Sequence, residues 1–164
     1  MNTYPIGLVP GPVSVPRKIR EAWLTDFGSS DLETEFYDLY AKNQKLVQTL
    51  LGTKESVVIT SGEAMSILWG GVKSALRPGE RLLAVASGLF GEGFADMARA
   101  IGAEAEVVAF PYDDVPDPEK VREAVRRFRP QLVTAVHCET PSGTLNPHLR
   151  ELGEIAREAD ALSL

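Results

Sequence analysis

Three short polar stretches of the sequence carry residues whose types and spacing could do chemistry. Residues 133–147, VTAVHCETPSGTLNP, run from a β-branched apolar segment into histidine, cysteine, glutamate and hydroxyl side chains, and then into a Pro/Gly loop. This stretch could be a nucleophile with its base, a metal-binding corner, or a loop that binds a polar ligand. Residues 59–65, ITSGEAM, and residues 87–94, SGLFGEGF, also follow apolar runs.

The first stretch is interpreted as a loop for a polar ligand. If residues 131–138 form one strand, His137 and Cys138 point to opposite faces and cannot form a catalytic dyad. A zinc site needs more His or Cys ligands than the chain's two histidines and one cysteine provide. The hydroxyl groups of Thr140 and Ser142 remain as neutral hydrogen-bonding groups, which suit the polar edge of a cofactor. Cys138 is interpreted as a small buried hydrophobic residue.

The second stretch has the features of a phosphate-binding loop. An expected strand ends near Ile59, and Thr60, Ser61 and Gly62 lead directly into an expected helix. The first backbone N–H groups of a helix are unpaired, and the helix dipole adds roughly half a positive charge there. Gly62 lets an anion approach, and the hydroxyl groups can donate to it. The alternative is that Thr60 or Ser61 only caps the helix and binds nothing.

The third stretch offers a flat aromatic side chain. Phe90 follows a strand end and is flanked by glycines, so its ring could stack on a planar ligand. The alternative is that the ring is tucked under the loop. The related segment GEGFAD has Asp96 where a dinucleotide fingerprint has its third glycine, and no GxxxxGK[ST] motif occurs. A nucleotide-binding α/β protein is therefore a weaker interpretation.

The elements that must position these stretches alternate along the chain. Unbroken apolar strands alternating with amphipathic helices predict an α/β fold with a mostly parallel sheet flanked by helices on both faces. Ligands bind such sheets at the carboxyl ends of the strands, where the loops 60–64, 87–94 and 137–146 are expected to meet. Strands are expected at 56–60, 81–86, 105–110 and 131–138, and helices near Pro16 and at 32–52, 62–76, 93–102, 117–129 and 147–159.

Composition restricts the class of protein. The chain has 164 residues, a net charge of −6 and no basic block, which argues against nucleic acid or an anionic membrane as a partner. No apolar run is long enough to span a bilayer, and the first 16 residues do not resemble a signal peptide. The single cysteine indicates a reducing compartment, so the protein is expected to be cytoplasmic.

Four motifs in this order resemble the class V pyridoxal-phosphate (PLP) aminotransferases, in the branch that contains alanine–glyoxylate and serine–pyruvate transaminases. They are LVPGPVSVP, TSGEAM, GLFGEGFADMARAIGAE and HCETPSGTLNP. The resemblance covers essentially the whole chain and implies a fold-type I PLP-dependent transferase. It implies an N-terminal arm at residues 1–13 and part of the PLP-binding large domain at residues 14–164.

The resemblance also implies a cofactor site. The phosphate would lie on Ser61, Gly62 and Glu63, the ring would stack on Phe90, and Thr140 would hydrogen-bond the phenolic oxygen of the ring.

The backbone of Gly11 is expected, by the same resemblance, to line the pocket for the substrate carboxylate. Glu63 departs from the small, hydroxyl or imidazole residue of the family. A carboxylate beside a phosphate dianion is repulsive unless it turns away or is protonated.

The resemblance places the family's two catalytic groups beyond Leu164. These are an aspartate at the pyridine nitrogen and the lysine that binds PLP covalently, and the six lysines of this chain all lie outside the family position. The sequence ends in ADALSL, where another strand begins, so it is expected to be cut short and to be inactive alone.

The implied function of the complete protein is transfer of an amino group from a small amino acid, such as alanine or serine, to a 2-oxo acid. The resemblance further implies a homodimer, and no metal is expected. The alternatives are a related PLP-dependent lyase or cysteine desulfurase, and a non-catalytic module that binds an anion or PLP.

Overall fold

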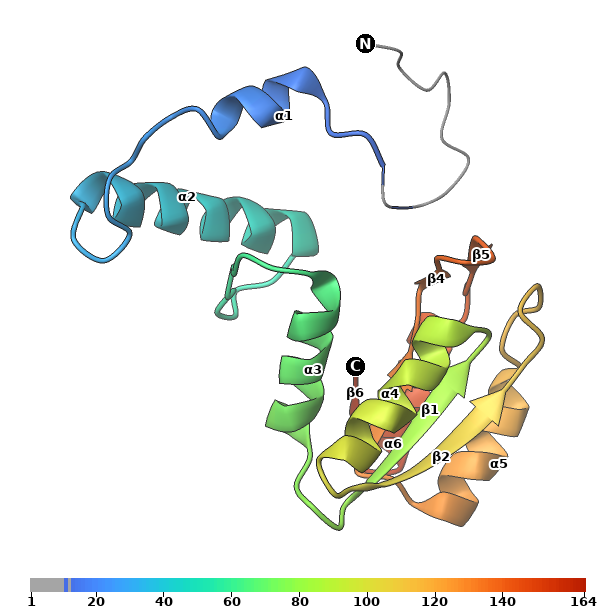
Figure 1. The fold of residues 1–164 in the computed structure, drawn as a ribbon. Helices are drawn as coiled ribbons and strands as arrows, with labels where there is room; N and C mark the ends of the chain where they lie inside the picture. Colours follow the sequence, from blue (N-terminus) through green and yellow to red (C-terminus); the bar gives the residue numbers. More distant parts are fainter. Residues whose placement is uncertain (1–10, 12) are drawn as a thin grey trace. The chain divides into compact units, whose positions relative to one another are not determined.

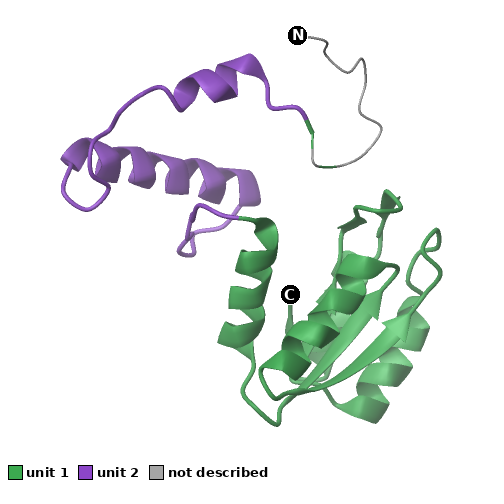
Figure 2. Ribbon diagram, in the orientation of Figure 1, with its two compact units in different colours: residues 1–13, 63–164 green, residues 14–62 purple. Residues whose placement is uncertain are grey.

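The computed structural model describes residue 11 and residues 13–164, so the expected arm at residues 1–13 lies almost entirely outside the described residues. Two compact units divide the chain, one from Ser14 to Gly62 and the other containing Glu63–Leu164 (Figure 2). Within residues 11 and 13–164, no helix combines the length and apolar composition needed to cross a membrane.

The unit from Glu63 to Leu164 is built on a four-stranded parallel sheet in the order β2-β1-β3-β6 (Figure 1). A separate antiparallel ribbon, β4 with β5, follows β3. The strands are β1 (Arg81–Ala86), β2 (Glu104–Ala109), β3 (Leu132–Ala135), β4 (Cys138–Glu139), β5 (Thr144–Leu145) and β6 (Leu162–Ser163). The helices of this unit are α3 (Ala64–Ala75), α4 (Leu89–Ala100), α5 (Pro118–Phe128) and α6 (Leu149–Glu158).

Two apolar cores cover the two faces of this sheet. Alternate side chains of a strand point to opposite faces, so Leu82 and Ala84 of β1 pack with α3 and α4, while Leu83 and Val85 pack with α5 and α6. All four side chains are at most 2% exposed. The expected α/β sheet with helices on both faces is confirmed.

The path of the chain creates a topological switch point between β1 and β3. The chain goes from β1 to β2 on one side, and then returns to pair β3 with the other edge of β1. Helix α4, which follows β1, packs on one face, whereas α6, which follows the β4–β5 ribbon, packs on the other. In open α/β sheets, ligands bind outside the carboxyl ends of the two strands at such a point.

Helix α4 begins earlier than the sequence indicates. Residues 87–94 were expected to form a loop and the helix to start at residue 93, but α4 starts at Leu89, with Gly88 at the N-cap. Gly88 has no side chain to cap the helix, and the cap comes from Glu139 instead. Because that cap lies 49 residues away in sequence, local pattern could not reveal it.

The expected strand at 131–138 is wrong in its last three residues. Strand β3 ends at Ala135, a bend follows at His137, and Cys138 belongs to β4. The argument that one strand points the side chains of His137 and Cys138 to opposite faces therefore fails. Cys138 is half-buried rather than buried. No hydrogen bond joins the two side chains within the part of the chain that the structure describes.

The unit from Ser14 to Gly62 contains two helices, α1 (Arg17–Ala22) and α2 (Thr34–Leu51). The longer helix was expected to begin directly after Asp31, but α2 begins at Thr34 with Glu33 at the N-cap. It ends as predicted at Gly52, whose φ of 63° is left-handed and favours glycine.

The strand expected at 56–60 is absent from the structure. These residues are extended but pair with no other strand among the described residues, and their backbone groups bond to side chains of α2 instead. The Tyr40 hydroxyl donates to the Ile59 carbonyl at 3.0 Å and accepts from the Ile59 N–H at 2.8 Å. Two glutamines of α2 continue the series, Gln44 to the Val57 carbonyl and Gln48 to the Glu55 carbonyl.

Matching periods explain this ladder of hydrogen bonds. Four residues of an α-helix rise about 6 Å, and two residues of an extended chain span about 6.6 Å, so three successive contacts stay in step. The ladder ends at Ile59, directly before Thr60, Ser61 and Gly62. Helix α2 thereby holds the segment that leads into the expected phosphate loop.

Replacing Tyr40 with phenylalanine is expected to loosen this segment locally. The change removes one donor and one acceptor at Ile59, and a typical hydrogen bond contributes about 1 kcal/mol, so exchange of the Ile59 amide should accelerate about fivefold. Hydrogen exchange in the full-length protein measures this. Tyr37→Phe is the matched control, because the Tyr37 hydroxyl bonds the Asp31 carbonyl instead. Unchanged exchange at Ile59 in Tyr40→Phe would contradict the ladder.

Candidate functional site

The carboxyl ends of β1 and β3 are joined by a buried carboxylate. Glu139 is 3% exposed, and its Oε1 accepts a hydrogen bond from the Phe90 N–H at 3.1 Å. Its Oε2 accepts from the Gly91 N–H, also at 3.1 Å. Phe90 and Gly91 are the second and third residues of α4, whose N–H groups a capping side chain normally satisfies. We call this arrangement of one carboxylate and two amides the Glu139 clamp.

The turn between β4 and β5 is closed by its own hydrogen bonds. The Gly143 N–H donates to the Glu139 carbonyl at 2.7 Å, with Gly143 at a φ of 72°, and the Asn146 N–H donates to the His137 carbonyl at 2.8 Å. The Ser142 hydroxyl donates to Thr144 Oγ1 at 2.9 Å, so it is engaged within the turn.

Thr140 is the hydroxyl residue of this turn that stays available to a ligand. It is half-buried directly after Glu139, and its side chain makes no hydrogen bond with other residues in the described ranges. The prediction that Ser142 also serves a ligand is weakened, because that hydroxyl already bonds Thr144.

A small cavity of about 10 Å³ with a mixed polar and apolar lining lies beside the clamp. Ser87, Glu139 and Asn146 are among the residues that line it. Ser87 Oγ and Asn146 Nδ2 are buried and have no hydrogen-bond partner among the described residues. The inner side of the site therefore contains buried polar atoms, which the two apolar cores beneath it contain less of.

Within the described residues, helix α3 has no side chain bonded to the N–H groups at its start, whereas α4 has the carboxylate of Glu139 there. Glu63 is the N-cap of α3, is exposed, and makes no side-chain capping bond, so neither Thr60 nor Ser61 caps this helix. The Glu139 clamp occupies the amides of the second and third residues of α4, and Asp117 caps α5 through the Glu119 N–H. Helix α3 packs against α4, and its Ser66 N–H bonds the Glu63 carbonyl, so the N–H groups of Ala64 and Met65 are the ones at its start that an anion could accept from.

The structure places the expected site residues in different parts of the chain. Phe90 is half-buried in the first turn of α4, and the Glu139 clamp connects it to the segment that carries Thr140. Ser61 and Gly62 are exposed at the end of the other unit, with Gly62 at a φ of 149°. Gly11 lies in a bend, and a Cβ there would meet no atom of the described residues within 4 Å.

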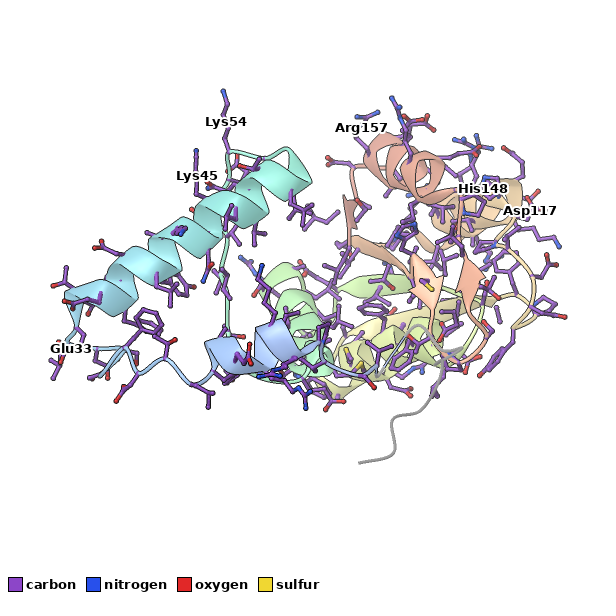
Figure 3. All side chains as sticks on the ribbon, turned by 90° about the horizontal axis from the view of Figure 1, so that it is seen from above. Glu33, Lys45, Lys54, Asp117, His148 and Arg157 are labelled. Atoms are coloured by element: carbon purple, nitrogen blue, oxygen red, sulfur yellow. The ribbon has the colours of Figure 1, made fainter. Side chains whose placement is uncertain are left out.

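The six lysines of the chain are all exposed. Lys45 and Lys54 project away from the ribbon of their unit (Figure 3). Lys73 lies in the last turn of α3, at the opposite end from Glu63, and Lys120 stands 6.0 Å from the centre of the Phe110 ring. Neither position adjoins the Glu139 clamp in sequence or in hydrogen bonding.

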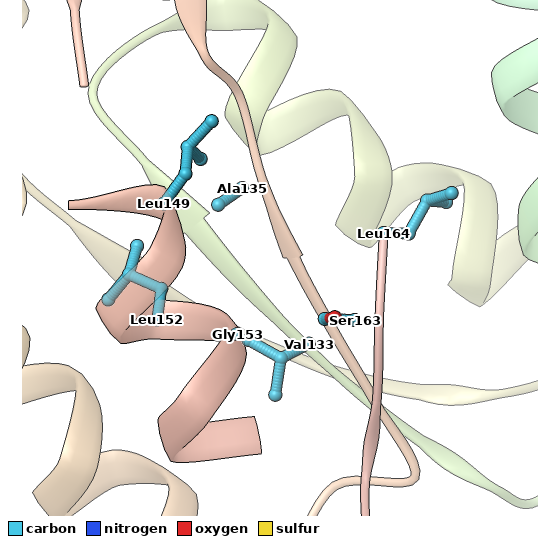
Figure 4. A pocket seen from close by; sticks show the side chains of 7 residues that line it. All are labelled: Val133, Ala135, Leu149, Leu152, Gly153, Ser163 and Leu164. Carbon is cyan, nitrogen blue, oxygen red and sulfur yellow. The ribbon is translucent and has the colours of Figure 1, made fainter. Parts of the chain in front are cut away.

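An apolar cavity of about 220 Å³ lies between α6 and the strands β3 and β6 (Figure 4). Leu149, Leu152 and Leu164 are among its lining residues, and none of the lining residues is ionisable. A cavity without an ionisable or nucleophilic group other than the hydroxyl of Ser163 is a poor candidate for chemistry. We therefore assign the candidate site to the carboxyl ends of β1 and β3.

Glu139 is the site residue that the sequence did not reveal. Its position between Cys138 and Thr140 after an apolar strand was visible, but its partners are amides of a helix 49 residues earlier. The available signal was indirect, namely a glutamate at one strand end and a helix start without a capping side chain at the neighbouring strand end.

The sheet, its switch point and its polar carboxyl edge define the class of fold. The structure is similar to the crystal structure of an alanine–glyoxylate aminotransferase from Nostoc sp., with a TM-score of 0.88 and 26% sequence identity. The match covers 99% of this chain and 45% of that chain. The fold is therefore that of fold-type I PLP-dependent aminotransferases.

The sequence comparisons then give the family. The model of the class V aminotransferases matches residues 21–164, and the chain belongs to this family. An uncharacterised aminotransferase of Methanocaldococcus jannaschii is 28% identical over 156 residues, which is 94% of this chain and 40% of the relative. A pyridoxamine–pyruvate transaminase of Mesorhizobium japonicum is 31% identical over 144 residues, 87% of this chain and 36% of the relative. The chain thus spans less than half the length of these relatives.

Members of this family depend on PLP, and the described residues fit that cofactor. An open helix start suits the phosphate, a half-buried aromatic ring suits a flat heterocycle, and an unengaged hydroxyl suits the phenolic oxygen. These three features belong to α3, α4 and the segment after β4, which all lie in the unit from Glu63 to Leu164.

Proposed function

We propose that this chain forms the cofactor-binding part of an aminotransferase that moves an amino group from a small amino acid, such as alanine or serine, to a 2-oxo acid. The observation that carries the proposal is the Glu139 clamp, which ties an aromatic ring and a free hydroxyl together at the switch point of a class V sheet. The names of similar proteins support small 2-oxo acids as acceptors, since they include pyruvate and glyoxylate.

Each residue of the site would have a separate task. The N–H groups at the start of α3, with Ser61, Gly62 and the backbone of Glu63, would hold the phosphate. The Phe90 ring would cover one face of the cofactor and exclude water from it. The Thr140 hydroxyl would donate to the phenolic oxygen, and the Gly11 backbone would line the substrate carboxylate pocket. When bound, PLP supplies the electron sink for the reaction.

We further propose that none of the six lysines of this chain holds PLP covalently, because all are exposed and lie outside the lysine position that the family resemblance implies. The 164 residues alone would then not transaminate. Borohydride reduction of the PLP-loaded full-length protein, followed by peptide mapping, tests this. An adduct on any of the six would contradict it.

A single-turnover experiment tests the proposed function. The full-length protein, loaded with PLP and mixed with L-alanine in the absence of an acceptor, should release one equivalent of pyruvate per subunit and lose its visible absorbance. Adding glyoxylate should then restore the absorbance. Release of sulfur from cysteine, or elimination from serine without amino transfer, would indicate a desulfurase or a lyase. Binding of PLP with no amino acid turned over would indicate a non-catalytic module.

The assembly is proposed to be a cytoplasmic homodimer. The unit from Ser14 to Gly62 has large apolar side chains that are strongly exposed, including Trp23, Leu24 and Leu50, each at least 82% exposed. Exposed apolar surface of this kind fits burial against a second subunit. Sedimentation of the full-length protein should therefore give twice the subunit mass.

A further inference from the structure

The Glu139 clamp joins the two segments that the proposed function assigns to the ring of PLP. On one side, the carboxylate holds the backbone of Phe90, and on the other side Glu139 directly precedes Thr140. No other hydrogen bond connects residues 87–91 with residues 136–146 within the described part of the chain. The carboxylate is therefore the hydrogen-bonded link between the backbone of Phe90 and the segment that carries Thr140 in this part of the chain.

We propose that Glu139 is a positioning residue of the cofactor site. It fixes the stacking ring relative to the hydrogen-bonding hydroxyl, and it closes the start of α4 so that the phosphate takes the start of α3. This inference rests on the proposed function for its consequence, whereas the clamp itself is a feature of the fold.

Gly88 is the steric counterpart of the clamp. A Cβ at Gly88 would lie 2.5 Å from Glu139 Cγ and 2.6 Å from Glu139 Cδ. The φ of Gly88 is 161°, an extended conformation that any residue adopts, so the need for glycine is steric. A side chain at position 88 must push the carboxylate away from the amides of Phe90 and Gly91.

The chemistry of the clamp requires two acceptor oxygens. An ionised carboxylate offers an acceptor to each of the two N–H groups at once. A glutamine of the same shape offers one acceptor and turns an NH₂ donor toward the second N–H. Glu139→Gln therefore keeps the volume and burial of the side chain but breaks one of the two contacts.

The test uses the full-length protein and the variants Glu139→Gln, Gly88→Ala and their combination. The matched controls are Glu92→Gln, an exposed glutamate of α4, and Gly93→Ala, where a Cβ would meet no atom within 4 Å. The apo-proteins are titrated with PLP, and the visible circular dichroism per bound cofactor reports how the ring is held.

Each single variant should raise the dissociation constant for PLP about tenfold and reduce the dichroism. The dissociation constant of the double variant should be about equal to that of the weaker-binding single variant, because both substitutions act on one contact.

Two further readouts make the outcome decisive. Amide exchange at Phe90 and Gly91 in the apo-protein should accelerate at least tenfold in Glu139→Gln and stay within twofold in Glu92→Gln. If exchange accelerates while the dissociation constant and dichroism do not change, the clamp is only structural and the proposal is overturned. If exchange does not accelerate, the clamp itself is overturned. If the wild-type protein binds no PLP, the proposed function is wrong. The exchange rates then still show whether Glu139 bonds the Phe90 and Gly91 amides. Should Glu139→Gln fail to fold, Gly88→Ala decides by the same readouts.

Discussion

Replacing Phe90 with alanine is expected to weaken PLP binding by the full-length protein about a hundredfold. Removing a largely covered aromatic side chain forfeits roughly 2 kcal/mol of apolar burial, and loss of stacking adds about 1 kcal/mol. A loss of about 3 kcal/mol corresponds to a factor of about 100 in the dissociation constant. Phe90 is half-buried without PLP, so part of the residue stays accessible to a ligand. Titration of the apo-protein with PLP measures the effect.

The control for this prediction is Phe90→Tyr, which keeps the flat ring and the backbone contact with Glu139. Its dissociation constant should stay within about threefold of that of the wild-type protein. If Phe90→Ala binds PLP as tightly as the wild-type protein, the ring does not stack on the cofactor. The proposal of a non-catalytic module with a different ligand position would then be preferred.

Replacing Gly91 with alanine is expected to lower the free energy of unfolding by about 3 kcal/mol, at the upper end of the usual cost of overpacking a core. A Cβ at Gly91 would lie 2.7 Å from Ala86 Cα, 2.9 Å from Ala86 Cβ and 3.2 Å from the Val85 carbonyl oxygen. Two of these three atoms belong to the backbone of β1, so relief requires α4 to move away from the sheet. That movement would also pull the Gly91 N–H away from Glu139.

Denaturant unfolding of the full-length protein tests this prediction, with Gly93→Ala as the matched control in the same helix. Among residues 11 and 13–164, no atom lies within 4 Å of a Cβ at Gly93, so alanine there should be neutral or stabilise the protein by up to about 1 kcal/mol through helix propensity. Equal stability of Gly91→Ala and Gly93→Ala would show that α4 does not pack against β1 as closely as described.

Elements with complete local signals were predictable from the sequence. Strand β1 was predicted with its observed bounds, because Arg81 and the five apolar residues after it lie between turn signals. Helix α5 was predicted at 117–129 with Pro118 in its first turn, and it is observed at Pro118–Phe128, where Asp117 proves to be its N-cap. In both cases the residues that decide the element lie within it or next to it.

Elements that depend on distant partners were not predictable. Residues 56–60 have the composition of a strand, but strand formation needs a neighbouring strand, and here the backbone bonds to Tyr40 and the two glutamines of α2. The start of α4 depends in the same way on Glu139. The order of polar loops at the sheet edge could be predicted, whereas the contact that organises them could not.

The most direct test of the account is the position of PLP in a crystal structure of the full-length protein. We predict the phosphate on the N–H groups at the start of α3, the ring against Phe90, and the phenolic oxygen within hydrogen-bond distance of the Thr140 hydroxyl. We also predict that the Glu139 carboxylate keeps both of its bonds to α4. A phosphate on the start of α4 in place of Glu139, or a ring with no contact to Phe90, would contradict the proposed cofactor site.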